Sequence, residues 1–131
     1  MFERLHHVGI AVADLDAAVR MTVRVLGGTL ARRDRLGQLD FALIDLAGVE
    51  LELLRSDDPE ASTSKFVANR GPGIHHLAYE VADLQAELQR LVDGGFEQSG
   101  EVRTGVHGTP IVFFHPRTTG GVLIELVQAN A

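Results

Sequence analysis

The amino-acid sequence predicts an α+β fold in which two β-α-β-β-β modules form a concave mixed sheet with helices on its outer face. The first observation behind this prediction is an internal repeat. The segment "LHHVGIAVADL", which begins at Leu5, aligns without a gap with "IHHLAYEVADL", which begins at Ile74. A second repeat aligns "GVELELL", from Gly48, with "GVLIELV", from Gly121. Each module therefore begins with a predicted strand that carries histidine and ends with one that carries glutamate.

The third observation is the periodicity of the apolar residues between these ends. Val8, Ile10 and Val12 alternate with small or polar residues, as on a strand that buries one face. Asp14 and Asp83 are suitable N-caps for the helices that follow, and a glycine pair ends each helix. The predicted buried stripes are Leu15, Val19, Thr22 and Leu26 in the first helix, and Leu84, Leu88, Leu91 and Val92 in the second. The apolar runs that follow the helices lie around Leu30, at 39–46 and at 49–54, and then at 96–102, 109–114 and 122–127.

This pattern predicts a single domain over residues 1–131. The first module covers about residues 4–56 and the second about residues 73–128. Residues 57–72 form a linker whose start is polar and rich in turn-forming residues, and a short helix is expected near residues 62–69.

Composition excludes several classes of protein. The formal net charge of −6 argues against nonspecific nucleic-acid binding, which needs a basic surface. The chain has no cysteine, so it has no disulfide, no thiolate nucleophile and no cysteine-type zinc site. No apolar run approaches the length of a membrane span, and the N-terminal residues do not resemble a signal peptide. We therefore expect a cytoplasmic protein with no membrane partner.

Two histidines and two glutamates are the candidate functional residues. By strand alternation, His7 and His76 point away from the most apolar face of their strands, and Glu52 and Glu125 occupy matching places on the last strand of each module. A buried ionised carboxylate is unfavourable by several kcal/mol unless a cation or a proton compensates it. Any one of the four residues alone would be interpreted as an ordinary core or edge residue, but the matched recurrence favours a divalent metal site. Nitrogen and oxygen donors without sulfur suit Co²⁺, which we expect first, and also Mn²⁺, Ni²⁺, Fe²⁺ or Zn²⁺.

The sequence resembles the vicinal oxygen chelate superfamily of glyoxalase-like proteins, and within it the methylmalonyl-CoA epimerase family. The resemblance is carried by "STSKFVANRGPG" and "GIHHLAYEV", and most strongly by "VHGTPIVFFHPRTTGGVLIELVQ". It implies a homodimer that interconverts (R)- and (S)-methylmalonyl-CoA by 1,1-proton transfer through a metal-stabilised enolate. The family's metal ligands fall on His7, Glu52, His76 and Glu125.

Epimerisation needs an acid/base group on each face of the planar intermediate. The resemblance implies that Glu125 is one of these groups, and that Asp40 stands where some family members carry the second, a glutamate. Asp40 is one methylene shorter than glutamate, which puts its reach in question. "MTVRVLGG", from Met21, also departs from the family, which commonly has an aromatic pair there.

A CoA substrate carries phosphates, so a net acidic chain must offer them local positive charge. The candidates are Lys65, Arg70, Arg103 and Arg117. No glycine-rich phosphate loop precedes a helix, so no nucleotide motif is assigned.

Three other functions are compatible with the repeat. A glyoxalase I-like isomerase would use the same four ligand types on a hemithioacetal. A ring-cleaving dioxygenase would hold Fe²⁺ with two histidines and one carboxylate, and the fourth candidate ligand argues against it. A non-catalytic small-molecule-binding protein of the superfamily would line its cleft with aromatic residues, whereas this chain has six Phe, one Tyr and no Trp.

Overall fold

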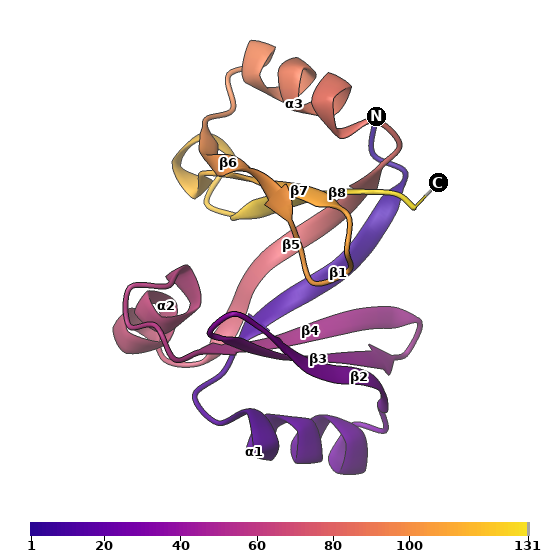
Figure 1. Ribbon diagram of the computed structural model, residues 1–131, viewed down its shortest axis with the longest axis vertical. Helices are drawn as coiled ribbons and strands as arrows, with labels where there is room; N and C mark the ends of the chain where they lie inside the picture. The colour runs from indigo at the N-terminus through magenta and orange to yellow at the C-terminus, as the bar shows by residue number, and fades with distance from the viewer. Residues whose placement is uncertain (131) are drawn as a thin grey trace. The chain divides into compact units, whose positions relative to one another are not determined.

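The computed structural model describes residues 1–130 and has the predicted α+β architecture (Figure 1). The strands are β1 (Arg4–Ala11), β2 (Thr29–Leu36), β3 (Leu39–Leu46), β4 (Val49–Ser56), β5 (Gly73–Val81), β6 (Gln98–Thr104), β7 (Pro110–Phe114) and β8 (Ile124–Gln128). The helices are α1 (Leu15–Arg20), the π-helix η1 (Met21–Val25), α2 (Ser62–Arg70), α3 (Leu84–Asp93) and the 3₁₀-helix η2 (Pro116–Thr118). The order β-α-β-β-β therefore occurs twice, with α2 between the two runs, which confirms the predicted fold class.

The chain divides into two compact units. We call residues 7–75 the N-terminal unit, and residues 1–6 together with those from 76 onward the C-terminal unit. The chain passes from one unit to the other inside β1 and again inside β5. Both crossings fall between the two histidines of a His-His pair, His6-His7 and His75-His76.

In the N-terminal unit the strand order is β2-β3-β4-β1. β1 runs parallel to β4, and the other neighbours are antiparallel. Helix α1 covers one face of this sheet and buries its apolar side against β3 and β4. The core on that face consists of Val12, Leu15, Ala42, Ile44 and Leu53.

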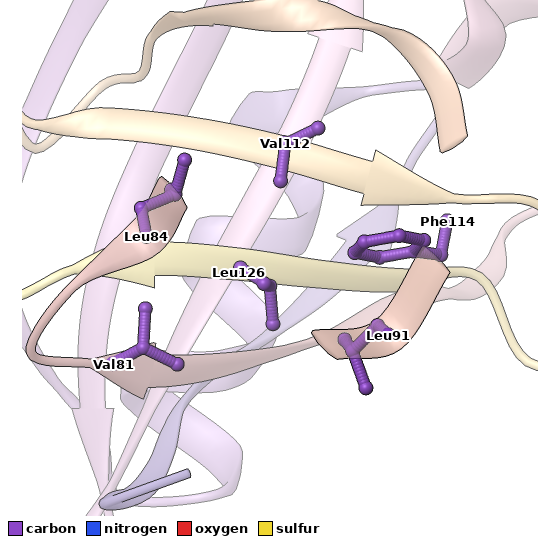
Figure 2. Close-up of a cluster of buried hydrophobic side chains, with 6 residues drawn as sticks. All are labelled: Val81, Leu84, Leu91, Val112, Phe114 and Leu126. Carbon is purple, nitrogen blue, oxygen red and sulfur yellow. The ribbon is translucent and has the colours of Figure 1, made fainter. Parts of the chain in front are cut away.

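The C-terminal unit repeats the arrangement. Its strand order is β5-β8-β7-β6, with β5 parallel to β8. Helix α3 packs against β7 and β8. Figure 2 shows the core beneath it, which consists of Val81, Leu84, Leu91, Val112, Phe114 and Leu126. One face of each sheet is therefore occupied by a helix, and the opposite face contains the candidate functional residues.

The helix boundaries follow the predicted caps. The carboxylates of Asp14 and Asp83 accept hydrogen bonds from the backbone N–H groups of Ala17 and Ala86, at 3.0 and 3.1 Å. Gly27, with φ of 87°, follows the end of the first helical segment.

The first helix differs from the prediction in its last turn, which is a π-helix. Thr22 Oγ1 donates to the Ala18 carbonyl at 2.8 Å, and the Leu26 N–H donates to the Met21 carbonyl at 3.2 Å, five residues back. This wider turn rotates Leu26 out of the buried stripe and leaves it 52% exposed, so the stripe predicted from a regular 3.6-residue period is wrong there. Val92, at the end of α3, is likewise exposed.

Among the residues that the structure describes, no helix is both long enough and apolar enough to cross a lipid bilayer.

The core beneath α3 predicts a large effect of truncation. Leu126 is 0% exposed, so Leu126→Ala removes buried contacts and leaves a cavity. We expect the free energy of unfolding to fall by about 2–5 kcal/mol, measured by denaturant titration. The control is Val25→Ala, at a position that is 76% exposed, which should change stability by no more than about 0.5 kcal/mol. Equal losses in the two variants would contradict this assignment of the core.

Candidate functional site

The N-terminal unit contains a buried pair formed by His7 and Glu52. Strand β1 lies beside β4 with Gly9 as the partner of Glu52, so His7, two residues before Gly9, faces the same side of the sheet as Glu52. His7 Nε2 lies 3.3 Å from Glu52 Oε2. The two side chains are 0% and 7% exposed. This face is opposite to the one that α1 covers.

The C-terminal unit contains the matching pair, His76 and Glu125. Ala78 is the partner of Glu125 on the neighbouring strand, and His76 again lies two residues before that small partner. His76 Nε2 lies 3.0 Å from Glu125 Oε1, and the side chains are 2% and 5% exposed. The structure therefore brings each histidine to the glutamate of its own unit, as strand alternation predicted.

The aromatic ring of Phe113 lines the second pair. Phe113 is the β7 partner of Glu125, and its ring meets the His76 imidazole edge-on at a centroid distance of 5.3 Å. The sequence prediction did not single out this residue. The adjacent phenylalanines in "IVFF" must face opposite sides of a strand, so alternation alone assigns one of them to the Glu125 face.

The chemistry of these donors suits a divalent cation. Each unit offers one imidazole nitrogen and one carboxylate oxygen, and the chain contains no sulfur ligand from cysteine. A carboxylate buried to this degree requires a compensating proton, donor or cation, and a neutral imidazole supplies either a hydrogen bond or a metal-binding lone pair. The donor types of each pair, taken by itself, are therefore those that bind a metal such as Co²⁺, Mn²⁺, Ni²⁺, Fe²⁺ or Zn²⁺.

Asp40 lies elsewhere in the N-terminal unit. On β3 it is the partner of Arg55, whereas the partner of Glu52 is Leu43, three residues further along. Side chains along a strand point alternately to its two faces, and Asp40 is three positions from Leu43, the residue that shares the Glu52 face. Asp40 therefore belongs to the face that α1 covers. Its carboxylate is 3.0 Å from both Arg35 Nη1 and Arg55 Nη1. The structure does not bring Asp40 to Glu52.

Asp57 completes this charged group. It pairs with Arg35 and Arg55, and hydrogen bonds from these two guanidinium groups hold the pKa of the Asp57 carboxyl below its ordinary value. Two arginines and two aspartates thus balance one another where β3 begins, as in a structural ion-pair network.

The four basic candidates differ in their partners. Lys65 pairs with Glu60 at 3.2 Å, and Arg117 Nε donates to Glu97 at 2.9 Å. The remaining two each lie over an aromatic ring: Arg70 over Phe66 and Arg103 over Phe113. Of these four contacts, only that of Arg103 with Phe113 involves the ring that also touches His76.

Comparison with protein families places the chain in a superfamily. Residues 6–113 match the model of the Glyoxalase/Bleomycin resistance protein/Dioxygenase superfamily. Among curated proteins, the chain is 38% identical to "Ethylmalonyl-CoA/methylmalonyl-CoA epimerase" of Cereibacter sphaeroides, and the match covers 98% of this chain and 99% of that protein. It is 34% identical to human "Methylmalonyl-CoA epimerase, mitochondrial", over 96% of this chain and 74% of the human protein.

Solved structures agree with these matches. The crystal structure of methylmalonyl-CoA epimerase from Mycobacterium tuberculosis has a TM-score of 0.91 and 37% identity, over 99% of this chain and 90% of that one. A methylmalonyl-CoA epimerase in complex with methylmalonyl-CoA and NH4+ also has a TM-score of 0.91, with 31% identity over 100% of this chain and 97% of that one. The chain therefore belongs to the Glyoxalase/Bleomycin resistance protein/Dioxygenase superfamily. Within that superfamily it is a member of the methylmalonyl-CoA epimerase family of enzymes.

The charged group around Asp57 predicts a pH-dependent contribution to stability. A carboxyl whose pKa is lowered on folding stabilises the protein above its unfolded pKa of about 3.9, and this stabilisation is lost as the pH falls through the folded pKa. The stability difference between the native protein and Asp57→Asn should thus be largest near neutral pH and shrink in acid. Denaturant titrations across pH check this, and 1 M salt should reduce the difference at neutral pH. A difference that does not change with pH would contradict the ion pairing.

Proposed function

We propose that this enzyme interconverts (R)- and (S)-methylmalonyl-CoA by removing and returning the proton on the α-carbon between the thioester and the carboxylate. The observation that carries the proposal is the buried His–Glu pair that occurs once in each unit. It occurs in a chain whose full-length relatives carry the name of this epimerase. A buried, paired glutamate can move a proton where water does not compete for it.

We further propose that His7, Glu52, His76 and Glu125 together bind one divalent metal ion, with Co²⁺ expected first and Mn²⁺, Ni²⁺, Fe²⁺ or Zn²⁺ as alternatives. Support comes from the donor types, from their burial, and from the identical placement of each pair within its unit. A bound divalent ion would supply Lewis-acid stabilisation of the negative charge that develops on the thioester oxygen as the proton leaves.

In this proposal Glu125 is the group that carries the proton. His76 Nε2 lies 3.0 Å from Glu125 Oε1, and the Glu125 carboxylate is the group proposed to accept the proton and return it. To form the opposite configuration at the α-carbon, a second group must return the proton on the opposite face of the planar intermediate. Asp40 was predicted for this role, and its ion pairs and its position on the helix-covered face argue against it. Glu52, the repeat counterpart of Glu125, is the first alternative.

Three further features belong to the same proposal. Residues 1–131 are proposed to act as a single domain, the protein to be a homodimer, and its location to be the cytoplasm. The proposed homodimer and acyl-CoA substrate follow the family resemblance. Light scattering on the purified protein at several concentrations tests the dimer, and a monomer at every concentration would contradict it.

The proposed reaction predicts exchange of one carbon-bound proton with solvent. Methylmalonyl-CoA incubated with the enzyme in D₂O should gain deuterium at the α-carbon, as measured by NMR. Treatment with a chelator should abolish the exchange, and added Co²⁺ should restore it. Glu125→Gln should lower the rate by about 10²- to 10⁴-fold, since the amide cannot accept the proton. The control is Glu80→Gln, which alters a carboxylate on β5 that pairs with Arg4 of β1.

The outcomes of this assay separate the candidate functions. Bound metal without α-proton exchange would contradict the epimerase and favour a glyoxalase-like or dioxygenase reaction. Absence of any bound metal, with the four residues intact, would favour a non-catalytic binding protein. Full activity in Glu125→Gln would remove Glu125 from the mechanism.

The placement of Asp40 predicts that its substitution has little effect on catalysis. Because its carboxylate is paired with Arg35 and Arg55, we expect Asp40→Asn to lower kcat by less than about tenfold, below the range of a lost general base. Steady-state epimerisation with a matched measurement of bound metal checks this. A loss of about 10²-fold or more with metal retained would instead establish Asp40 as the second proton carrier.

A further inference from the structure

We propose that Arg103 binds the free carboxylate of the acyl group and thereby selects a carboxylated acyl-CoA over a simple one. This inference rests on the proposed acyl-CoA substrate and adds a specificity-determining residue to it. The residues that carry it all lie within the C-terminal unit.

An irregularity in the sheet puts Arg103 on the Glu125 face. In the β6–β7 ladder Ser99 is the partner of Phe113, and Arg103 is the partner of Ile111. Three residues of β6 thus lie between these two pairs, opposite a single residue of β7. A regular ladder that continued from Ser99 would place Glu101 opposite Ile111, and the bulge places an arginine there instead. The bulge therefore exchanges a negative charge for a positive one on the face that carries Glu125.

Local contacts hold the Arg103 side chain in this position. Its guanidinium carbon lies 5.2 Å from the centroid of the Phe113 ring, within the range of a cation–π contact. Gly100, with φ of +77°, lies in the bulge beside it, and a Cβ there would sit 3.6 Å from Arg103 Nη1. The same Phe113 ring contacts His76 at 5.3 Å. One aromatic ring therefore separates the guanidinium from the His76–Glu125 pair.

The charge of Arg103 is not neutralised by a carboxylate in the described part of this unit. The other arginines there are all paired, in the contacts Arg4–Glu80, Arg90–Glu87 and Arg117–Glu97. The N-terminal unit provides a contrast: Arg32 also lies over a phenylalanine, at 5.3 Å, but its Nη2 is 2.8 Å from Asp34. Arg103 is thus a pre-positioned guanidinium without an ion-pair partner among residues 1–6 and 76–130.

The position of Arg103 favours the acyl carboxylate over the phosphates of CoA as its ligand. The reacting carbon must lie against Glu125, and the carboxylate is bonded directly to that carbon. The phosphates are separated from it by the whole pantetheine arm. A guanidinium one aromatic ring away from His76 matches the nearer anion, and its planar fork suits a carboxylate.

Calorimetric titration with two ligands tests this assignment. Methylmalonyl-CoA and propionyl-CoA share the CoA moiety and the thioester, and only the former carries the carboxylate. Arg103→Gln should weaken binding of methylmalonyl-CoA by about 10- to 100-fold and leave propionyl-CoA within about twofold. Arg103→Lys should restore part of the loss because it keeps the charge but not the fork. The control is Arg24→Gln, which makes the same charge change at an exposed position of η1.

The outcomes distinguish the sources of anion recognition. Equal weakening of both ligands by Arg103→Gln would assign Arg103 to the CoA phosphates and overturn the proposal. Unchanged binding of both ligands, or equal weakening by Arg24→Gln, would also overturn it. A native protein that shows the Arg103-dependent preference but no α-proton exchange would contradict the epimerase and leave this assignment standing. A native protein that exchanges the α-proton but shows no Arg103-dependent preference would support the epimerase and overturn the assignment of Arg103.

Discussion

The pairing of a buried imidazole with a buried carboxylate is the constraint on which both halves of the chain depend. Glu52 and Glu125 are each buried within a strand whose other residues are mostly apolar, where an uncompensated charge would oppose folding. In each unit the residue beside the glutamate on the neighbouring strand is small, Gly9 or Ala78, and the histidine precedes it by two residues. The internal repeat preserves this arrangement of histidine, small residue and glutamate, together with the parallel pairing of strands that creates it.

The two units are alike in this pair and differ around it. In the N-terminal unit, two arginines and two aspartates form a balanced charged group where β3 begins. The C-terminal unit instead carries a bulge that places Arg103 over Phe113. A metal centre built by duplication can be nearly symmetric, but a substrate with one thioester and one carboxylate is not. Asymmetric surroundings are therefore what selective binding of such a substrate requires.

Much of the fold and of the two His–Glu pairs could be predicted from the sequence, because the repeat and the period-two alternation are visible in the order of the residues. The caps at Asp14 and Asp83 and the faces of His7 and His76 follow from nearest-neighbour geometry. The π-helical turn at Met21–Val25 could not be predicted, because it depends on hydrogen bonds that a regular period does not reveal. The faces on which the Asp40 and Arg103 side chains lie depend on the register of one strand against another. A shift of one residue reverses a side chain, and no local pattern specifies where a bulge falls.

We propose that one imidazole and one carboxylate from each half bind a single cation. The most direct test of this proposal is the stoichiometry of Co²⁺ binding, measured by equilibrium dialysis on the native protein and on His7→Asn and His76→Asn separately. We expect one tightly bound ion per chain, and strong weakening of that binding by either substitution alone. Two ions per chain, or one ion retained at native affinity when either histidine is replaced, would mean that the two pairs act independently and would contradict a single shared site.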